Sequence, residues 1–211
     1  MDAPESCWHC GQPAADSLFC AYCNRLQPPA PDYFRFFGLE PRLALDPEDL
    51  QRRYYELSRK LHPDRFLAAT AAERQYSLEG TAILNDAYRV LRDPVARAEY
   101  LLRREGLEEV SPGRRTPPEL LREIFELNEA LEAFREDPRA GRAQLDRARE
   151  RLRALRQQAD AELARLFRLW DERRERGRLE EVRGVLERRR YVSKLETQLE
   201  EALSDVGAHP D

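Results

Sequence analysis

Four cysteines near the start of the chain have the spacing of a metal site. They form two Cys-x-x-Cys pairs, Cys7 with Cys10 and Cys20 with Cys23, and nine residues separate the pairs. Each pair can close a tight turn, and four thiolates satisfy the tetrahedral coordination of structural Zn²⁺. Because no cysteine remains elsewhere to staple the chain, the cluster favours metal binding over disulfides. We predict a small four-cysteine knuckle over residues 1–26, with one structural zinc ion per chain.

Other interpretations of the cysteines remain open from the sequence. The pairs could be redox-active or disulfide-bonded, and the same ligand set also accepts iron. A catalytic metal would need an open coordination position, which four sulfurs do not leave. His9 could replace one sulfur, but the ligand shell is already complete, so we predict that His9 is not a ligand.

A second group of residues with chemical character is His62, Pro63 and Asp64. Apolar residues recur at helical spacing on both sides of it, in residues 50–61 and 83–91. Pro63 disfavours helical geometry at His62 and cannot continue the preceding helix. The tripeptide therefore presents an imidazole and a carboxylate in an exposed loop between two helices. We interpret it as a docking surface, because no nucleophile or third polar partner lies nearby in the sequence.

The helix before this loop carries a basic face. Its apolar residues lie on the opposite side of the helical wheel. Taken alone, such a run of charge is most often an ordinary solvated face. Beside the tripeptide, we interpret it as part of the docking surface. The four cations are Arg52, Arg53, Arg59 and Lys60.

These motifs resemble a J-domain, the co-chaperone module that acts with DnaK-type chaperones. The first and last motifs of this region, together with the helical region that follows them, resemble the HscB family, the J-proteins of iron–sulfur cluster assembly. The resemblance covers about residues 32–205 and is looser in its C-terminal part. Besides the tripeptide, it is carried by Asp32-Tyr33-Phe34, Phe37-Gly38-Leu39, Asn85-Asp86-Ala87-Tyr88 and Arg97-Ala98-Glu99-Tyr100.

The resemblance implies a chain that performs no chemistry itself. By this resemblance, His62 and Asp64 would act together at the interdomain linker of a DnaK/HscA-type chaperone and stimulate its ATP hydrolysis. The residue after the tripeptide, usually Lys in the family, is Arg65 here and keeps the charge. The sequence also has no glycine-rich phosphate loop and no GxSxG elbow. We expect an ATPase activator and not an enzyme.

The first helix of the C-terminal region carries an apolar pair, Leu121 and Phe125, outside its core stripe. Six Glu stand against two Arg over residues 119–136, so the pair has acidic surroundings. An apolar pair among carboxylates is typical of a partner-binding patch, although the pair could instead be buried against a neighbouring helix or the J-domain. The predicted core stripe is Leu120, Ile124, Leu127, Leu131 and Phe134.

The resemblance gives this patch a partner, because HscB-like proteins bind an IscU-type iron–sulfur scaffold protein through this helix and an aromatic residue of the last helix. A methionine of the family is replaced by Arg122 here. A general J-protein with another client would share the J-domain but not this patch. The matching positions are Leu121, Phe125, Glu126, Glu129 and Tyr191.

Composition narrows the class of protein. Of 211 residues, 36% are charged and 41% hydrophobic, and the net charge of −4 comes from interspersed signs. No domain is strongly basic, so we expect no nucleic-acid partner. No apolar run reaches the length of a membrane span, so we expect no membrane partner. The N-terminus lacks the features of a signal or transit peptide, and we expect a cytoplasmic protein.

The predicted fold class is all-α, with a J-domain helical hairpin and a C-terminal three-helix bundle after the four-cysteine knuckle. The bundle follows from helical periodicity and short connections, with Gly177 expected to end its second helix. Three prolines predict an extended linker before the J-domain. The predicted parts are 1–26 (knuckle), 27–31 (linker), 32–103 (J-domain), 104–117 (linker), 118–205 (scaffold-binding bundle) and 206–211 (tail).

Overall fold

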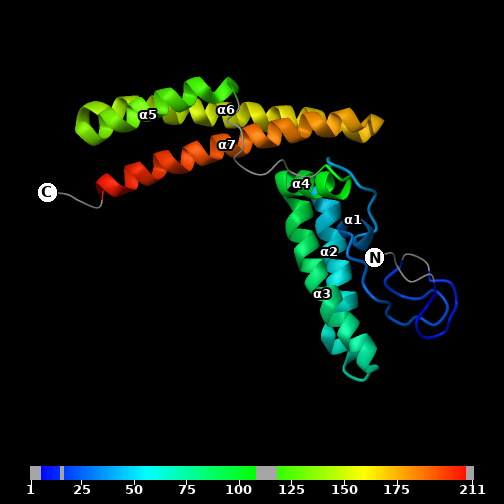
Figure 1. Ribbon diagram of the computed structural model, residues 1–211. Coiled ribbons are helices and arrows are strands. Elements are labelled where there is room, and N and C mark those ends of the chain that lie inside the picture. The colour runs from blue at the N-terminus through cyan, green and yellow to red at the C-terminus, as the bar shows by residue number, and fades with distance from the viewer. Residues whose placement is uncertain (1–5, 15–16, 108–117, 208–211) are drawn as a thin grey trace. The chain divides into compact units, whose positions relative to one another are not determined.

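The computed structural model describes residues 6–14, 17–107 and 118–207. Over these ranges it contains helices, turns and two isolated β-bridges, and no strand, which confirms the all-α prediction. The chain forms two compact units, residues 1–101 and 102–211 (Figure 1). No helix within the described ranges combines the length and the apolar character that crossing a membrane requires.

A helical hairpin forms the body of the first unit. Its two long helices, α2 and α3, lie side by side, and their facing apolar residues are buried (Figure 1). Asp46 caps the start of α2, and Thr70 with Glu73 forms a capping box at the start of α3. The helices are α1 (Tyr33–Phe36), α2 (Pro47–Leu61), the 3₁₀ helix η1 (Pro63–Phe66), α3 (Ala71–Arg92) and α4 (Pro94–Arg104), and the division between the units falls within α4.

The C-terminal end of α2 is fixed against α3 at Leu61. This side chain is fully buried, and a Cβ at Gly80 would lie only 3.3 Å from Leu61 Cδ2. The hydroxyl of Ser77 donates to Leu61 O at 2.6 Å. Carbonyls in the last turn of a helix have no intrahelical partner, so this hydrogen bond satisfies one of them. The point from which the chain leaves α2 is thereby tied to α3.

Arg97 and Tyr100, which belong to the motifs shared with J-domains, hold α4 to the rest of the first unit. The buried guanidinium of Arg97 donates to Leu43 O at 2.9 Å and also to Leu91 O. The hydroxyl of Tyr100 accepts from Tyr33 N at 2.9 Å, and the two tyrosine rings stack with centroids 4.5 Å apart. Both motif residues therefore have packing roles.

The second unit is the predicted three-helix bundle. The long helices α6 and α7 form a hairpin, and α5 lies along α6 (Figure 1). Leu120, Leu127, Leu131 and Phe134 are buried in its core and Ile124 packs against it, which confirms the predicted stripe. The elements are the 3₁₀ helix η2 (Pro118–Leu120), α5 (Leu121–Glu136), α6 (Pro138–Arg173) and α7 (Arg176–Gly207).

The prediction that Gly177 ends the second helix of the bundle is wrong. The break falls at Arg174, which adopts the left-handed conformation with φ 55°, and Gly177 lies inside the first turn of α7. The left-handed conformation costs about 1–2 kcal/mol for a residue with a Cβ. The guanidinium of Arg174 lies 4.3 Å from the ring centroid of Trp170, and this cation–π contact offsets part of the cost.

Gly141 of α6 lies directly against the backbone of α5. A Cβ at this position would fall inside van der Waals contact with the backbone of Phe134. We expect Gly141→Ala to lower the free energy of unfolding of the second unit by about 1–3 kcal/mol, although alanine is the better helix former by about 1 kcal/mol. Urea unfolding followed by Trp170 fluorescence, with Trp8→Phe as background, measures this.

Gly184→Ala is the matched control for this substitution. Gly184 lies in α7, and a Cβ added there would have nothing within 4 Å, so alanine should stabilise the unit by up to about 1 kcal/mol. Equal gains at Gly141 and Gly184 would show that the α5–α6 contact is not tight.

Candidate functional site

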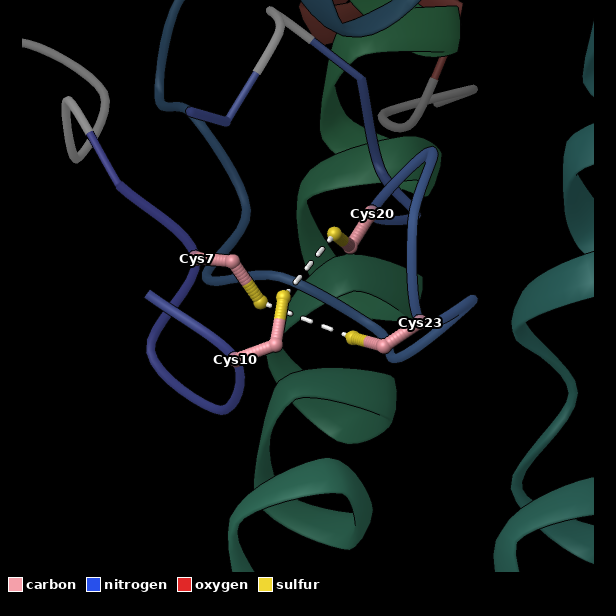
Figure 2. A group of neighbouring side chains, drawn as sticks. All are labelled: Cys7, Cys10, Cys20 and Cys23. Atoms are coloured by element: carbon pink, nitrogen blue, oxygen red, sulfur yellow. Dashed lines mark hydrogen bonds between the residues drawn. The ribbon is translucent and has the colours of Figure 1, made fainter. Parts of the chain in front are cut away.

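The four cysteine sulfurs form a compact group in the first unit (Figure 2). All four lie within 4.8 Å of one another, with Cys7 Sγ 3.7 Å from Cys23 Sγ and Cys10 Sγ 3.8 Å from Cys20 Sγ. Zinc–sulfur bonds of about 2.3 Å in a tetrahedron place the sulfurs about 3.8 Å apart. The two sequence pairs are therefore brought together with the spacing that one tetrahedral metal ion requires.

The two knuckles have the same backbone design. In the first, Gly11 N donates to Cys7 O at 2.9 Å, and in the second, Asn24 N donates to Cys20 O at 2.9 Å. Gly11 and Asn24 both have positive φ, 71° and 55°. Glycine and asparagine adopt this conformation at least cost. A Gly or Asn directly after each Cys-x-x-Cys pair was therefore a further signal in the sequence.

The thiols differ in how readily they ionise. Burial raises the pKa of Cys7, but hydrogen bonds from the backbone N–H groups of Cys10 and His9 and from the thiols of Cys10 and Cys20 together outweigh burial and lower that pKa to about 6. For Cys23, the backbone N–H of Arg25 lowers the pKa, but burial and the neighbouring thiols raise it to about 12. Four thiolates so close together repel one another, and a divalent cation among them removes that repulsion.

The cysteine module is packed onto the helical hairpin. Arg25 Nη1 lies 2.6 Å from Glu73 Oε2 on α3, and the rings of Trp8 and Tyr76 meet edge to face with centroids 6.0 Å apart. Gln27, the first residue of the predicted linker, is buried. Module and hairpin thus belong to one compact unit, although the prolines predicted a spacer between them. The predicted domain boundaries stay predictions.

His62 and Asp64 of the tripeptide are exposed, as predicted, and Pro63 between them is partly buried. His62 ends α2 with extended backbone (ψ 127°), and Pro63 opens η1. The side chains of His62 and Asp64 are 57% and 78% exposed, with Nδ1 of the imidazole 3.6 Å from Oδ2 of the carboxylate. His62 Nδ1 also accepts from Asp64 N at 3.3 Å. The structure therefore presents an imidazole and a carboxylate together on the surface.

Sequence reasoning missed what holds this loop in place. Buried Phe66 anchors η1, and Ser77 and Gly80 of α3 fix the end of α2 as described above. The available signal was a row of small residues on α3, Ser77, Gly80 and Thr81, at the helical spacing of one face.

The four predicted cations of α2 do not form one uniform face. Arg52 pairs with Asp49 and, at 2.9 Å, with Glu56. Arg53 pairs with Asp49 at 2.8 Å and donates to Phe37 O at 3.1 Å, which ties α2 to the turn after α1. These two arginines therefore have intramolecular partners.

The other two cations, Arg59 and Lys60, are exposed in the last turn of α2 beside His62. In the described part of the chain, no carboxylate lies within ion-pair distance of either. The positive charge next to the tripeptide thus comes from Arg59 and Lys60 before it and from exposed Arg65 after it in η1.

The apolar pair of α5 is exposed, as the helical wheel predicted. Leu121 is 57% exposed and Phe125 is 63% exposed. Glu126 and Glu129 are exposed on the same helix, and Glu126 pairs with Arg122 at 2.7 Å. The alternative, in which the pair is buried against a neighbouring helix of the bundle, does not hold.

Tyr191 is placed differently from the rest of the predicted patch. It lies on α7, partly buried against the bundle core. Sequence reasoning also missed Glu123, a buried residue of α5 that pairs with Arg151 of α6 at 3.1 Å. A binding role for Tyr191 stays a prediction, and the structure adds a packing role.

Comparison with known proteins matches both helical regions. A family model described as DnaJ domain matches residues 32–100, and one described as HSCB C-terminal oligomerisation domain matches residues 116–200. The iron–sulfur cluster co-chaperone protein HscB of Mus musculus is 31% identical over 205 residues, which cover 93% of this chain and 82% of the mouse protein.

Two further relatives agree with this match. A co-chaperone protein HscB homolog of Bordetella pertussis is 39% identical over 127 residues, covering 58% of this chain and 75% of its own length. The crystal structure of human co-chaperone protein HscB superposes with a TM-score of 0.71 at 28% identity, covering 92% of this chain and 96% of the human chain.

Proposed function

We propose, from the premise that this chain belongs to the HscB family of iron–sulfur cluster co-chaperones, that it stimulates the ATPase of a DnaK/HscA-type chaperone and delivers an IscU-type scaffold protein to it. The observation that carries this proposal is the exposed, rigidly mounted His62-Pro63-Asp64 in a DnaJ-type hairpin. The chain itself would catalyse nothing.

The mounting of the tripeptide explains how it acts on a partner without doing chemistry. Ser77 and Leu61 fix the end of α2, and Phe66 anchors η1, so the imidazole and carboxylate are displayed from a supported turn. A preformed turn loses less conformational entropy on binding than a free loop. Binding free energy is then available to favour the hydrolysing state of the chaperone.

The positive charge next to the tripeptide supports a partner that binds through an acidic surface. Arg59 and Lys60 extend from the last turn of α2, next to His62. Exposed charges of this kind raise association rates and act over about 10 Å at 0.1 M salt. Arg52 and Arg53 contribute less net charge, because both are paired with carboxylates.

The exposed pair on α5 supports a second partner. Leu121 and Phe125 present apolar surface, and Glu126 and Glu129 flank it. An apolar centre with a polar rim is the usual anatomy of a protein–protein interface. We assign this patch to the scaffold protein. Holding chaperone and scaffold with one chain raises the effective concentration of each for the other.

The cysteine module completes the proposal, as a structural zinc site. Cys7, Cys10, Cys20 and Cys23 supply four sulfur ligands, and tetrahedral sulfur coordination suits Zn²⁺. A bound zinc ion would supply folding free energy and no catalytic position, because four sulfurs leave no open ligand site. The same ligands accept iron, so the identity of the metal is part of the test.

We expect about one zinc ion per chain, lost on Cys7→Ser with Cys10→Ser, because two ligands cannot hold the ion at the affinity of four. Elemental analysis of the purified protein measures the content. His9→Gln is the control and should keep its metal, since His9 is exposed and outside the sulfur group. Iron in place of zinc, or a metal-free wild type, would contradict this assignment.

His62→Gln should abolish ATPase stimulation and leave stability within about 0.5 kcal/mol, as surface substitutions usually do. The imidazole is exposed, and its one local hydrogen bond, from Asp64 N, is long at 3.3 Å. Steady-state ATP hydrolysis by a purified DnaK/HscA-type chaperone is the measurement. His9→Gln serves again as the matched control and should stimulate normally. Full stimulation by a well-folded His62→Gln protein would refute the J-domain assignment.

Leu121→Ala with Phe125→Ala should weaken scaffold binding by at least about 30-fold, because loss of one hot-spot anchor alone removes about 2 kcal/mol or more. Stability should barely change, since both side chains are exposed. Calorimetric titration with an IscU-type scaffold measures the affinity. Stimulation of the chaperone in the absence of scaffold should be spared.

Two further variants control this experiment. Leu78→Ala removes an equally exposed leucine, 56% against 57% for Leu121, from the J-domain and should leave scaffold affinity unchanged. Tyr191→Ala should lose stability as well as affinity, because the ring packs against the core. Unaltered affinity in a stable Leu121/Phe125 variant would mean that the patch serves another client, as in a general J-protein.

A further inference from the structure

Arg25 is held in position by the fold of the second knuckle. Its carbonyl accepts from Cys20 N at 2.9 Å and from Gln27 Nε2 at 2.8 Å. Gln27 Nε2 also donates to Cys7 Sγ at 3.4 Å, so the same amide contacts a metal-site sulfur. The backbone of Arg25 is therefore set by the cysteine module, whose short chain depends on a metal ion for its folding free energy.

Glu73 receives this arginine at the start of α3. Its Oε2 accepts from Arg25 Nη1 at 2.6 Å, from Thr70 Oγ1 at 3.0 Å and from Thr70 N at 3.3 Å. The carboxylate is 5% exposed. Burial raises its pKa, but the hydrogen bonds from Thr70 and Arg25 outweigh burial and lower that pKa, so Glu73 is ionised at neutral pH. One oxygen thus closes the capping box of α3 and binds the module.

The first knuckle touches the same region of α3. The ring of Trp8 meets Tyr76 edge to face, with an interplanar angle of 73°. Trp8 Nε1 donates to Leu26 O at 2.8 Å, which fixes the ring on the module. Tyr76 follows Glu73 by three residues, on the same side of the helix. Both knuckles therefore contact the first turns of α3.

The chaperone-facing loop, residues 62–70, has two anchors. The end of α2 is tied to α3 by the Ser77–Leu61 hydrogen bond, and the start of α3 is closed by Thr70 and Glu73. The second anchor shares its carboxylate with the cysteine module. The Glu73 carboxylate belongs to the N-terminal cap of α3. Its contact with Arg25 therefore affects how well the first turn of α3 is ordered.

We propose that metal binding by the cysteine module is thermodynamically coupled, through Arg25 and Glu73, to the order of the first turn of α3, so that the metal-loaded module supports the chaperone-facing loop. The consequence for ATPase stimulation rests on the proposed function. The coupling itself does not, because it is a property of this chain alone. Coupling is reciprocal, so the factor by which bound metal favours the ordered turn equals the factor by which the ordered turn raises metal affinity. A change that loosens the Arg25–Glu73 contact must therefore also weaken metal binding.

Arg25→Met in the full chain tests the coupling, since methionine keeps an unbranched side chain and removes the guanidinium. With zinc bound, the variant should exchange the amide hydrogens of residues 73–76 at least about fivefold faster than the wild type. Its zinc affinity, measured by competition with a chromophoric chelator, should fall by a similar factor. Chelation of the wild type should accelerate exchange at the same amides, while amides of α6 and α7 stay unchanged.

Arg89→Met is the matched control, because Arg89 forms an exposed pair with Asp86 on the same helix at 2.8 Å. It should change neither zinc affinity nor exchange at residues 73–76. Wild-type exchange and wild-type affinity in zinc-loaded Arg25→Met would overturn the proposal, as would wild-type exchange that is insensitive to chelation.

Chaperone ATPase assays with the same proteins separate this proposal from the proposed function. Metal-loaded wild type should stimulate more than either the chelated wild type or Arg25→Met. If no form stimulates while the exchange rates are coupled, the proposed function fails and the coupling stands. If the wild type stimulates equally with and without metal and its exchange does not respond, the coupling fails and the proposed function stands.

Discussion

The seam between α2 and α3 at Leu61 is the constraint on which the J-type unit depends. A buried leucine side chain lies against a glycine, and a serine hydroxyl takes up the last carbonyl of α2. These contacts need small residues at two positions one turn apart on α3, and any bulk there would separate the helices. Pro63 ends α2, and the seam fixes where that end lies against α3, so the two together determine where His62 and Asp64 reach the surface.

Much of this architecture could be read from periodicity and from capping residues. Helical spacing identified the core stripe of α5, and the same wheel placed Leu121 and Phe125 outside it, where the structure has them exposed. Four cysteines in two pairs identified the sulfur cluster without help from tertiary structure. The helical stripe is a local feature, since residues a few positions apart determine it. The sulfur cluster could be predicted because four cysteines at this spacing are typical of a metal site.

What could not be predicted depends on contacts between distant residues. Arg25 and Glu73 are 48 positions apart, and no local pattern marks them as partners. Arg53 lies in a basic run by sequence, yet its donors face the carbonyls of Phe37 and Gly38. α6 ends at Arg173 with Arg174 as its left-handed cap, and not at the nearby glycine, and an aromatic ring one turn earlier receives the guanidinium of that cap. Tertiary packing overrides local preference at each of these positions.

The tight connection at Arg174 and Glu175 also determines the order in which the second unit can assemble. Only these two residues separate helices of 36 and 32 residues, so the α6–α7 contacts nearest the turn close very short loops. Short-range contacts form quickly, and hairpins of this kind grow outward from the turn. α5 leaves the ribosome before either helix and packs chiefly on α6. Until α6 has been synthesised, both apolar faces of α5, the core stripe and the exposed pair, are therefore open to chaperones and to other chains.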